Sequence, residues 1–299
     1  MFKIFNILLL FMTFNTFVDA RDIRFEINSI IKKAFAQEED KTRIANMAST
    51  NKMLSQKIAK NAILIYNDID IDSNYKELTK SAREFNSFIE GMYNGDKDLK
   101  LKKTTDKDIL KELDEVNSVW KPFYKSILSL YKNGKKDKKA YKYIVDNNEK
   151  LMRLSHKLTQ TLQSKHILNT QDNQVKVYTL KIADRQRMLT QKMFKEKFLL
   201  YTNQDVERNR VRLRGSMILF KNGLNALIDG EDRRGTAKVT DKKIRAKLEQ
   251  MKKFYTEVEN IYKKQKVNLS EIKKLSNIDK ELLNLSIDVV KMIENTLVY

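Results

Sequence analysis

The fold of this chain is decided by the stretch Arg187-Met188-Leu189-Thr190-Gln191-Lys192-Met193, of which the sequence holds a second copy. The other copy comes earlier in the chain, as Met53-Leu54-Ser55-Gln56-Lys57, and lies 135 positions before its counterpart Met188 to Lys192. Apolar residues recur at three- and four-residue spacing around both copies, from Ile44 to Ile65 and from Ile182 to Leu200. Because that spacing places apolar side chains on one helix face, it predicts an amphipathic helix at each copy.

Other parts of the chain match at the same offset, so the five-residue match is part of a longer repeat. The same offset relates Thr105-Asp106-Lys107 to Thr240-Asp241-Lys242, and Leu113 to Leu248. Two further pairs match with small shifts, Phe85 to Gly91 with Leu224 to Gly230, and Leu154-Ser155 with Leu285-Ser286. We therefore predict two copies of one module of about 130 residues, an ordinary size for a domain.

Polar residues lie on or beside the apolar stripe of each predicted helix. They are Asn51, Ser55, Gln186 and Thr190. Such side chains need hydrogen-bond partners if a bundle buries them. The other face of each helix carries charge. Lys52 and Gln56 are one turn apart there, as are Arg187 and Gln191, so each pair can reach one point.

The two copies resemble a known family. Ala183 to Met193 follow the pattern Ala-x-x-Gln-Arg-Met-Leu-(Ser/Thr)-Gln-(Lys/Arg)-Met, and the first copy follows it more loosely from Asn46 to Ala59. This pattern resembles the start of the PilJ-type domain, the extracytoplasmic N-terminal domain of type IV pili methyl-accepting chemotaxis transducers. That domain is similar to the sensor domain of nitrate/nitrite sensor kinases. Trp120-Lys121-Pro122-Phe123 also looks like the family's third helix. The resemblance implies antiparallel four-helix bundles that sense small anions or other small solutes, often as dimers.

The resemblance also implies a ligand site. In the nitrate-sensing relatives, the arginine just before the motif's methionine contacts the anion at a dimer axis. That position is Arg187 here, with Arg185 and Gln191 near it, and the first copy has Lys52 and Gln56. Lysine keeps the charge but loses the bidentate fork of arginine. Two copies within one chain could pair with each other and imitate the family dimer. The alternative is that Arg185 and Arg187 are surface charges and that the motif only serves packing.

Residues 1–20 read as a secretory signal. Lys3 precedes a mostly apolar run from Ile4 to Phe17, and Val18-Asp19-Ala20 places small residues before a cleavage point. The run is shorter than the roughly 20 apolar residues of a membrane-spanning helix. We expect a cleaved signal and an exported, periplasmic protein, with an uncleaved anchor as the alternative. No later segment is apolar enough to span a membrane.

The rest of the chain predicts an all-α protein. Residues 21–40 form a lead-in segment, residues 41–168 a first four-helix module and residues 169–299 a second. Breaks are predicted at Gly91 to Gly95, at Asn133-Gly134 and at their counterparts, with Ser73, Asp106 and Asp241 as helix caps. Between the modules, Lys165 to Val177 holds neither proline nor glycine. A continuous helix there would stack two antiparallel bundles end to end, whereas a break at Asn169 to Asn173 would not.

Composition limits the function further. The formal net charge of +20 attracts anions, although interleaved Asp and Glu and the lack of a nucleic-acid module argue against a dedicated nucleic-acid reader. The chain has no cysteine, and its two histidines, His156 and His166, would face different sides of one helix. It also lacks a Gly-rich phosphate loop and a nucleophile elbow. We therefore expect no enzyme, no cofactor and no metal.

The family's membrane helix and signalling domain do not follow the second module in this sequence. We therefore expect the chain to act through a membrane receptor or sensor kinase, with homodimerisation left open. The first hypothesis is a sensor-like protein that binds a small, nitrate-like anion or another small solute. The alternative is a non-sensing, basic helical envelope protein that binds acidic polymer, pilus or membrane surface.

Overall fold

The structure is a computed structural model that describes residues 20–133, 137–166, 171–231 and 236–297. The predicted secretory signal falls on residues 1–19 and thus lies outside the described residues, apart from Ala20. The chain divides into two compact units, Met1–Lys41 and Thr42–Tyr299. The described helices are α2 (Ala20–Tyr66), α3 (Ile71–Asn94), α4 (Lys107–Asn133), α5 (Lys138–His166), α6 (Gln171–Tyr201), α7 (Val206–Asp229), α8 (Lys242–Lys263) and α9 (Leu269–Leu297). None of them combines the length and the apolar character that a membrane span requires.

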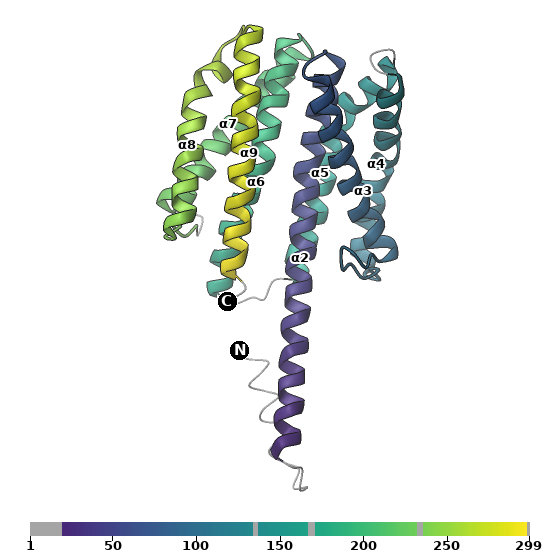
Figure 1. The fold of residues 1–299 in the computed structure, drawn as a ribbon, viewed down its shortest axis with the longest axis vertical. Helices are drawn as coiled ribbons and strands as arrows, with labels where there is room; N and C mark the ends of the chain where they lie inside the picture. The colour runs from purple at the N-terminus through teal and green to yellow at the C-terminus, as the bar shows by residue number, and fades with distance from the viewer. Residues whose placement is uncertain (1–19, 134–136, 167–170, 232–235, 298–299) are drawn as a thin grey trace. The chain divides into compact units, whose positions relative to one another are not determined.

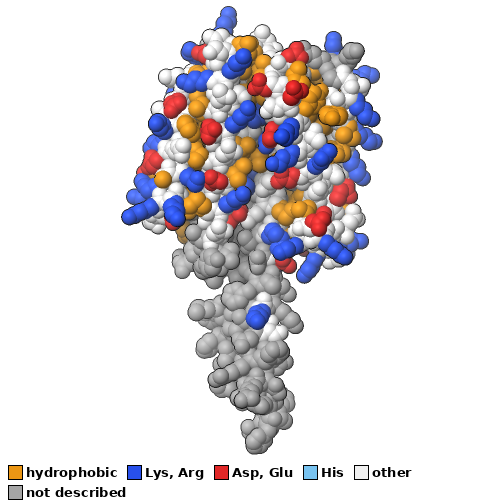
Figure 2. Space-filling model, in the orientation of Figure 1, with side chains coloured by type: hydrophobic (Ala, Val, Ile, Leu, Met, Phe, Trp, Pro, Cys, Tyr) orange, Lys and Arg blue, Asp and Glu red, His pale blue; other side chains and the backbone are white. Residues whose placement is uncertain are grey.

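The unit that starts at Thr42 contains two antiparallel four-helix bundles, as predicted (Figure 1). Bundle 1 consists of α2 from Thr42 onward, α3, α4 and α5. Bundle 2 consists of α6, α7, α8 and α9, each of which packs against two neighbours in the bundle. The amphipathic faces of these helices meet in the interiors, where Phe85, Trp120 and Phe220 have at most 1% of their surface exposed. On the visible face of this unit, Lys and Arg alternate with Asp and Glu (Figure 2).

The structure repeats with the predicted offset of 135 residues. Asp106 and Asp241 each cap a helix by accepting hydrogen bonds from backbone N–H groups two and three positions ahead. Asp70 and Asp205, also 135 apart, are both left-handed residues that precede a helix. Asp tolerates this conformation better than most residues, and α3 therefore begins at Ile71. The prediction that Ser73 caps this helix is wrong, because Ser73 lies in its first turn.

The structure corrects one predicted pairing of the repeat and supports another. Gly95 and Gly230 both have a φ of 82° and end equivalent helices, so Gly230 corresponds to Gly95 and not to Gly91. The second helices therefore keep the offset of 135 residues. In the fourth helices the offset does differ from 135, as predicted. The ion pair of Lys157 with Glu112 in bundle 1 recurs as Asp288 with Lys247 in bundle 2, which requires an offset of 131 between α5 and α9.

The two bundles lie side by side, and the predicted end-to-end stacking through a continuous helix is wrong. Helix α5 ends at His166, α6 begins at Gln171, and the two helices run antiparallel. Their pairing is shown by Lys192 of α6, which contacts Glu149 of α5, and by Gln204, just past the end of α6, which contacts Tyr141 near the start of α5. The predicted break at Asn169 to Asn173 fits this reversal, although residues 167–170 lie outside the described residues.

Burial around α6 explains why the bundles pair. Every residue from Leu189 to Leu199 is buried, including the charged Lys195 and Glu196. A helix that is buried on all sides must be covered by more than the three other helices of its own bundle. The additional cover comes from bundle 1, which contributes Gln56 and Lys60 of α2 and Glu149 of α5.

Candidate functional site

The two copies of the motif lie between the bundles. Lys52 and Arg187 each expose 6% of their surface, and Gln56 and Gln191 expose none. The prediction that these residues form a charged outer face is therefore wrong for the assembled chain, because the opposite bundle covers that face. Asn51 is buried as predicted, and its side-chain amide donates to the Phe85 carbonyl at 3.1 Å.

Three of the predicted site residues, Lys52, Arg185 and Arg187, gather around Asp184. We call these four residues the cationic cluster. Arg187 donates a hydrogen bond from its guanidinium to the Asp184 carboxylate, which is 1% exposed. Burial lowers the pKa of Lys52 to about 8; Asp184 opposes this shift, and Arg187 and Arg185 add to it. Lys52 belongs to α2 and the other three to α6, so the cluster joins both repeats.

Several groups in the cationic cluster lack partners. The Nε of Arg187 and one oxygen of Asp184 are buried and have no hydrogen-bond partner among the described residues. Buried donors are almost always paired in folded proteins, by protein, water or ligand. The unpaired Nε–H of Arg187, with the charge of Lys52 nearby, thus marks this cluster as a candidate anion site.

Neighbouring ionisable groups respond to both the cations and the Asp184 carboxylate of the cluster. Burial lowers the pKa of His156 to about 4, and Lys52, Arg185 and Lys181 lower it further in the same direction. The pKa of Glu294 is raised to about 7 by burial and by Asp184, whereas Arg187 opposes the rise. At pH 7 the imidazole of His156 is thus neutral, and the fixed positive charge comes from the lysine and the arginines.

The other two predicted residues, Gln56 and Gln191, lie one turn further along in a separate buried network. We call this network the charge layer. Gln191 donates to both oxygens of Asp279 at 3.1 and 3.2 Å, and Lys60 donates to the same carboxylate at 2.7 Å. Gln56 donates to the Asn148 carbonyl at 3.2 Å and accepts from Lys195 at 2.6 Å. The structure therefore does not bring all five predicted residues to one point.

The charge layer has the symmetry of the repeat. Gln56 corresponds to Gln191 and Lys60 to Lys195 at the offset of 135, and Asn148 corresponds to Asp279 at the offset of 131. Each glutamine binds the fourth helix of its own bundle, and each lysine reaches the fourth helix of the other bundle. The two copies therefore pair with each other, as the sequence analysis allowed for a chain that imitates a dimer.

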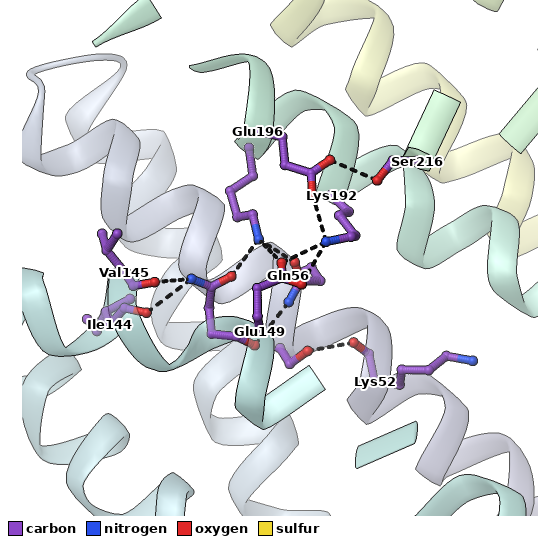
Figure 3. Close-up of polar contacts among 11 residues, drawn as sticks. Lys52, Gln56, Ile144, Val145, Glu149, Lys192, Glu196 and Ser216 are labelled. Atoms are coloured by element: carbon purple, nitrogen blue, oxygen red, sulfur yellow. Dashed lines mark hydrogen bonds and ion pairs between the residues drawn. The ribbon is translucent and has the colours of Figure 1, made fainter. Parts of the chain in front are cut away.

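A cluster of acids and lysines completes the charge layer (Figure 3). Lys192 lies 2.7 Å from both Glu149 and Glu196, and Lys195 lies 2.7 Å from Glu149. Burial by itself raises the pKa of Glu149, but Lys195 and Lys192 outweigh it and lower the pKa to about 2. Burial raises the pKa of Glu196, which accepts from Ser216 at 2.8 Å. Within the described ranges, no three His, Asp or Glu side chains are grouped so that they could hold a metal.

Sequence reasoning missed most of the charge layer. Lys60, Lys195, Asn148, Glu149, Glu196 and Asp279 were not predicted as site residues. One signal was present, because Lys60 and Lys195 follow Gln56 and Gln191 by one turn at the same offset. A lysine one turn after the motif in both copies points to a shared role, but its burial depends on a partner that only the assembled chain supplies.

Comparison with known proteins agrees with the repeat. The model of the PilJ family, described as type IV pili methyl-accepting chemotaxis transducer N-term, matches residues 34–147 and 178–269. Each match contains one copy of the motif. No curated protein and no solved structure matches the chain.

Proposed function

The chain belongs to the family of type IV pili methyl-accepting chemotaxis transducer N-terminal domains, and from this membership we propose a sensory protein that binds a small oxyanion. The proposed site is the cationic cluster between the two repeats. The observation that carries the proposal is the unpaired Nε of Arg187, buried beside Lys52 of the other repeat.

The chemistry of the cluster suits a small, singly charged oxyanion such as nitrate or nitrite. Asp184 engages one amino group of the Arg187 guanidinium, which leaves the Nε–H free. An anion oxygen can accept from this Nε–H while another accepts from the Lys52 ammonium. A large or multiply charged anion would pay a higher desolvation cost in a site whose cations expose only 6% of their surface.

The position of the cluster suggests how occupancy could be sensed. Lys52 lies on α2 and Arg187 on α6, so a bound anion would contact both bundles. A ligand shifts a conformational equilibrium only through differential affinity for the two states. An anion shared by two bundles favours the arrangement that holds both cations close. We propose that this arrangement is read by a membrane receptor or sensor kinase on the periplasmic side.

The test is thermal unfolding of residues 21–299 with and without millimolar nitrate, nitrite, chloride and sulfate at fixed ionic strength. A ligand of the folded state at a hundredfold excess over its Kd stabilises by about 2.7 kcal/mol. We expect one oxyanion to raise the Tm. Because Arg187→Ala alone leaves Asp184 buried and unpaired, the matched variant is Asp184→Asn/Arg187→Gln, and it should abolish the shift.

The control variant is Arg212→Gln on α7, which is outside the cluster and should keep the full shift. Two outcomes would count against the proposal. One is an absence of any shift with the whole panel, and the other is a shift that survives in the double variant.

A further inference from the structure

Bundle 2 contains an amphipathic groove between α7 and the end of α8, and none of the residues of the cationic cluster lines it. Its volume is about 760 Å³, within the range of roughly 300–1,000 Å³ that is usual for pockets of organic ligands. Leu213, Met217 and Ile218 supply apolar wall, and Ile218 is half exposed although it is a large apolar residue. Lys and Arg make up nearly half of the remaining lining.

The repeat shows why this space is open. In bundle 1, the corresponding position of α3 is Tyr75, whose ring packs edge-on against Tyr131 at 5.5 Å. The Tyr75 hydroxyl donates to the Leu130 carbonyl at 3.0 Å, which ties α3 to the last turn of α4. In bundle 2 the counterpart of Tyr75 is Arg210, which lines the groove and pairs outward with Glu207 at 2.8 Å.

Helix α8 also ends early. The offset of 135 from the end of α4 at Asn133 would carry α8 to residue 268, but it ends at Lys263. A buried lysine, Lys197, donates instead to the carbonyls of Tyr262 and Lys264 and so holds the shortened end. Its counterpart in bundle 1 is Ala62. The missing turn is thus replaced by a specific side chain, which indicates a built groove.

The charged side chains that line the groove favour an anionic ligand. Six Lys or Arg residues line it, against a single carboxylate, Glu259. Glu259 is already within 3.0 Å of Lys263. Within the described part, Arg214 and Lys266 line the groove without any acidic partner. A ligand head group that carries one negative charge would find these two cations at the rim and apolar wall behind them.

We propose that this groove binds a single-chain organic anion, an amphiphile whose head group contacts Arg214 and Lys266 and whose apolar chain covers Leu213, Met217 and Ile218. A small inorganic anion would leave the apolar wall exposed, and a neutral chain would leave the cations unpaired. The site takes a different ligand from the cationic cluster and rests mainly on α7, the end of α8 and the segment that follows it.

The test is isothermal titration of the purified protein with octanoate, nonanoate and decanoate below their micelle concentrations. Each methylene that enters the apolar part of the groove should strengthen binding by roughly fourfold. Decanol and inorganic phosphate serve as neutral and headgroup-only probes, and we expect both to bind at least tenfold more weakly than decanoate.

Two variants locate the site. Arg210→Tyr restores the residue of bundle 1 and fills the groove, and Arg214→Gln removes a rim charge; we expect each to weaken decanoate binding at least tenfold. Arg208→Gln, on the same helix and outside the lining, is the matched control and should bind as the unaltered protein does. All three residues are exposed, so circular dichroism should show an unchanged fold.

Several results would overturn the proposal. They are undetectable decanoate binding at millimolar concentration, affinity that is independent of chain length, equal binding of decanol, or unchanged affinity in Arg210→Tyr. Loss of binding in Arg208→Gln would also count against it, because that residue lies outside the groove. Since Lys52 and Arg187 are absent from this groove, Lys52→Met should leave decanoate binding unchanged, which separates this test from that of the small-anion site.

Discussion

Replacement of Lys60 by methionine should destabilise the chain by about 3 kcal/mol, because it leaves a carboxylate buried without its cation. Lys60 on α2 and Asp279 on α9 form an ion pair of 2.7 Å between the bundles, and their side chains expose 8% and 1%. Removing one partner of a buried pair costs about 3–5 kcal/mol. We expect a cost at the lower end of this range because Gln191 still donates to both oxygens of Asp279.

The pH dependence of Lys60→Met follows from the sign of the shift. Burial raises the pKa of Asp279 above its usual value, and Lys60 opposes that rise. Without Lys60 the pKa should rise further. A folded pKa above the unfolded one means that stability falls as pH rises through the folded pKa. The deficit of the variant should therefore shrink at acidic pH, where Asp279 takes up a proton.

The assay is urea unfolding followed by far-ultraviolet circular dichroism at pH 5 and pH 7.5. The double variant Lys60→Met/Asp279→Leu holds no unpaired charge and should lie within about 1 kcal/mol of the unaltered protein. Lys57→Met is the matched control on the same helix. Lys57 pairs with Glu77 at 2.6 Å, but these side chains expose 17% and 40%, so the loss should stay below about 1 kcal/mol. A loss below 1 kcal/mol in Lys60→Met, or additive effects in the double variant, would refute the pairing of the bundles.

Three further predictions concern the interior. The affinity for the small anion should fall roughly tenfold between pH 7 and 9, because Lys52, with a pKa of about 8, loses its proton; titration calorimetry should show no such fall in Lys52→Met. Glu149→Gln should cost about 3 kcal/mol at pH 7 in urea unfolding, and the loss should fade as pH falls from 4.5 toward 2, because the folded pKa of Glu149 is about 2. Gly223→Ala should lower the Tm, since a Cβ there would lie 2.1 Å from Nε2 of Gln186. A Cβ at Gly215 meets no atom within 4 Å, so Gly215→Ala should raise the free energy of unfolding by up to about 1 kcal/mol. Equal effects of the two glycine changes would contradict the packing of Gln186.

Local features of the fold could be predicted from the sequence because they depend on neighbouring residues. Asp106 and Asp241 precede helices and carry the side-chain oxygens that a cap needs, and the structure confirms both caps. The helix ends at Gly95 and Gly230 follow from the positive φ that glycine permits. The wrong cap at Ser73 has the same local origin, because a left-handed Asp70 starts the helix three residues earlier than a serine cap would.

The arrangement of the bundles depends on contacts that no local pattern reveals. Lys165 to Val177 contains no helix breaker, so its sequence is compatible with either a rod or a reversal. The reversal buries Lys195 against Glu149 and Lys60 against Asp279, residues that are far apart in the sequence. Lysine is ordinarily a surface residue, so a pattern-based analysis places these side chains outside. The charge layer was missed for that reason.

The most direct test of the account is the stoichiometry of anion binding in titration calorimetry. The oxyanion that raises the Tm most should bind once per chain, because Lys52 and Arg187 come from different repeats and share one site. The affinity should fall roughly tenfold in Lys52→Met, and binding should be lost in Asp184→Asn/Arg187→Gln. Two sites per chain, or unchanged affinity in Lys52→Met, would contradict the claim that the two repeats form a single anion site between them.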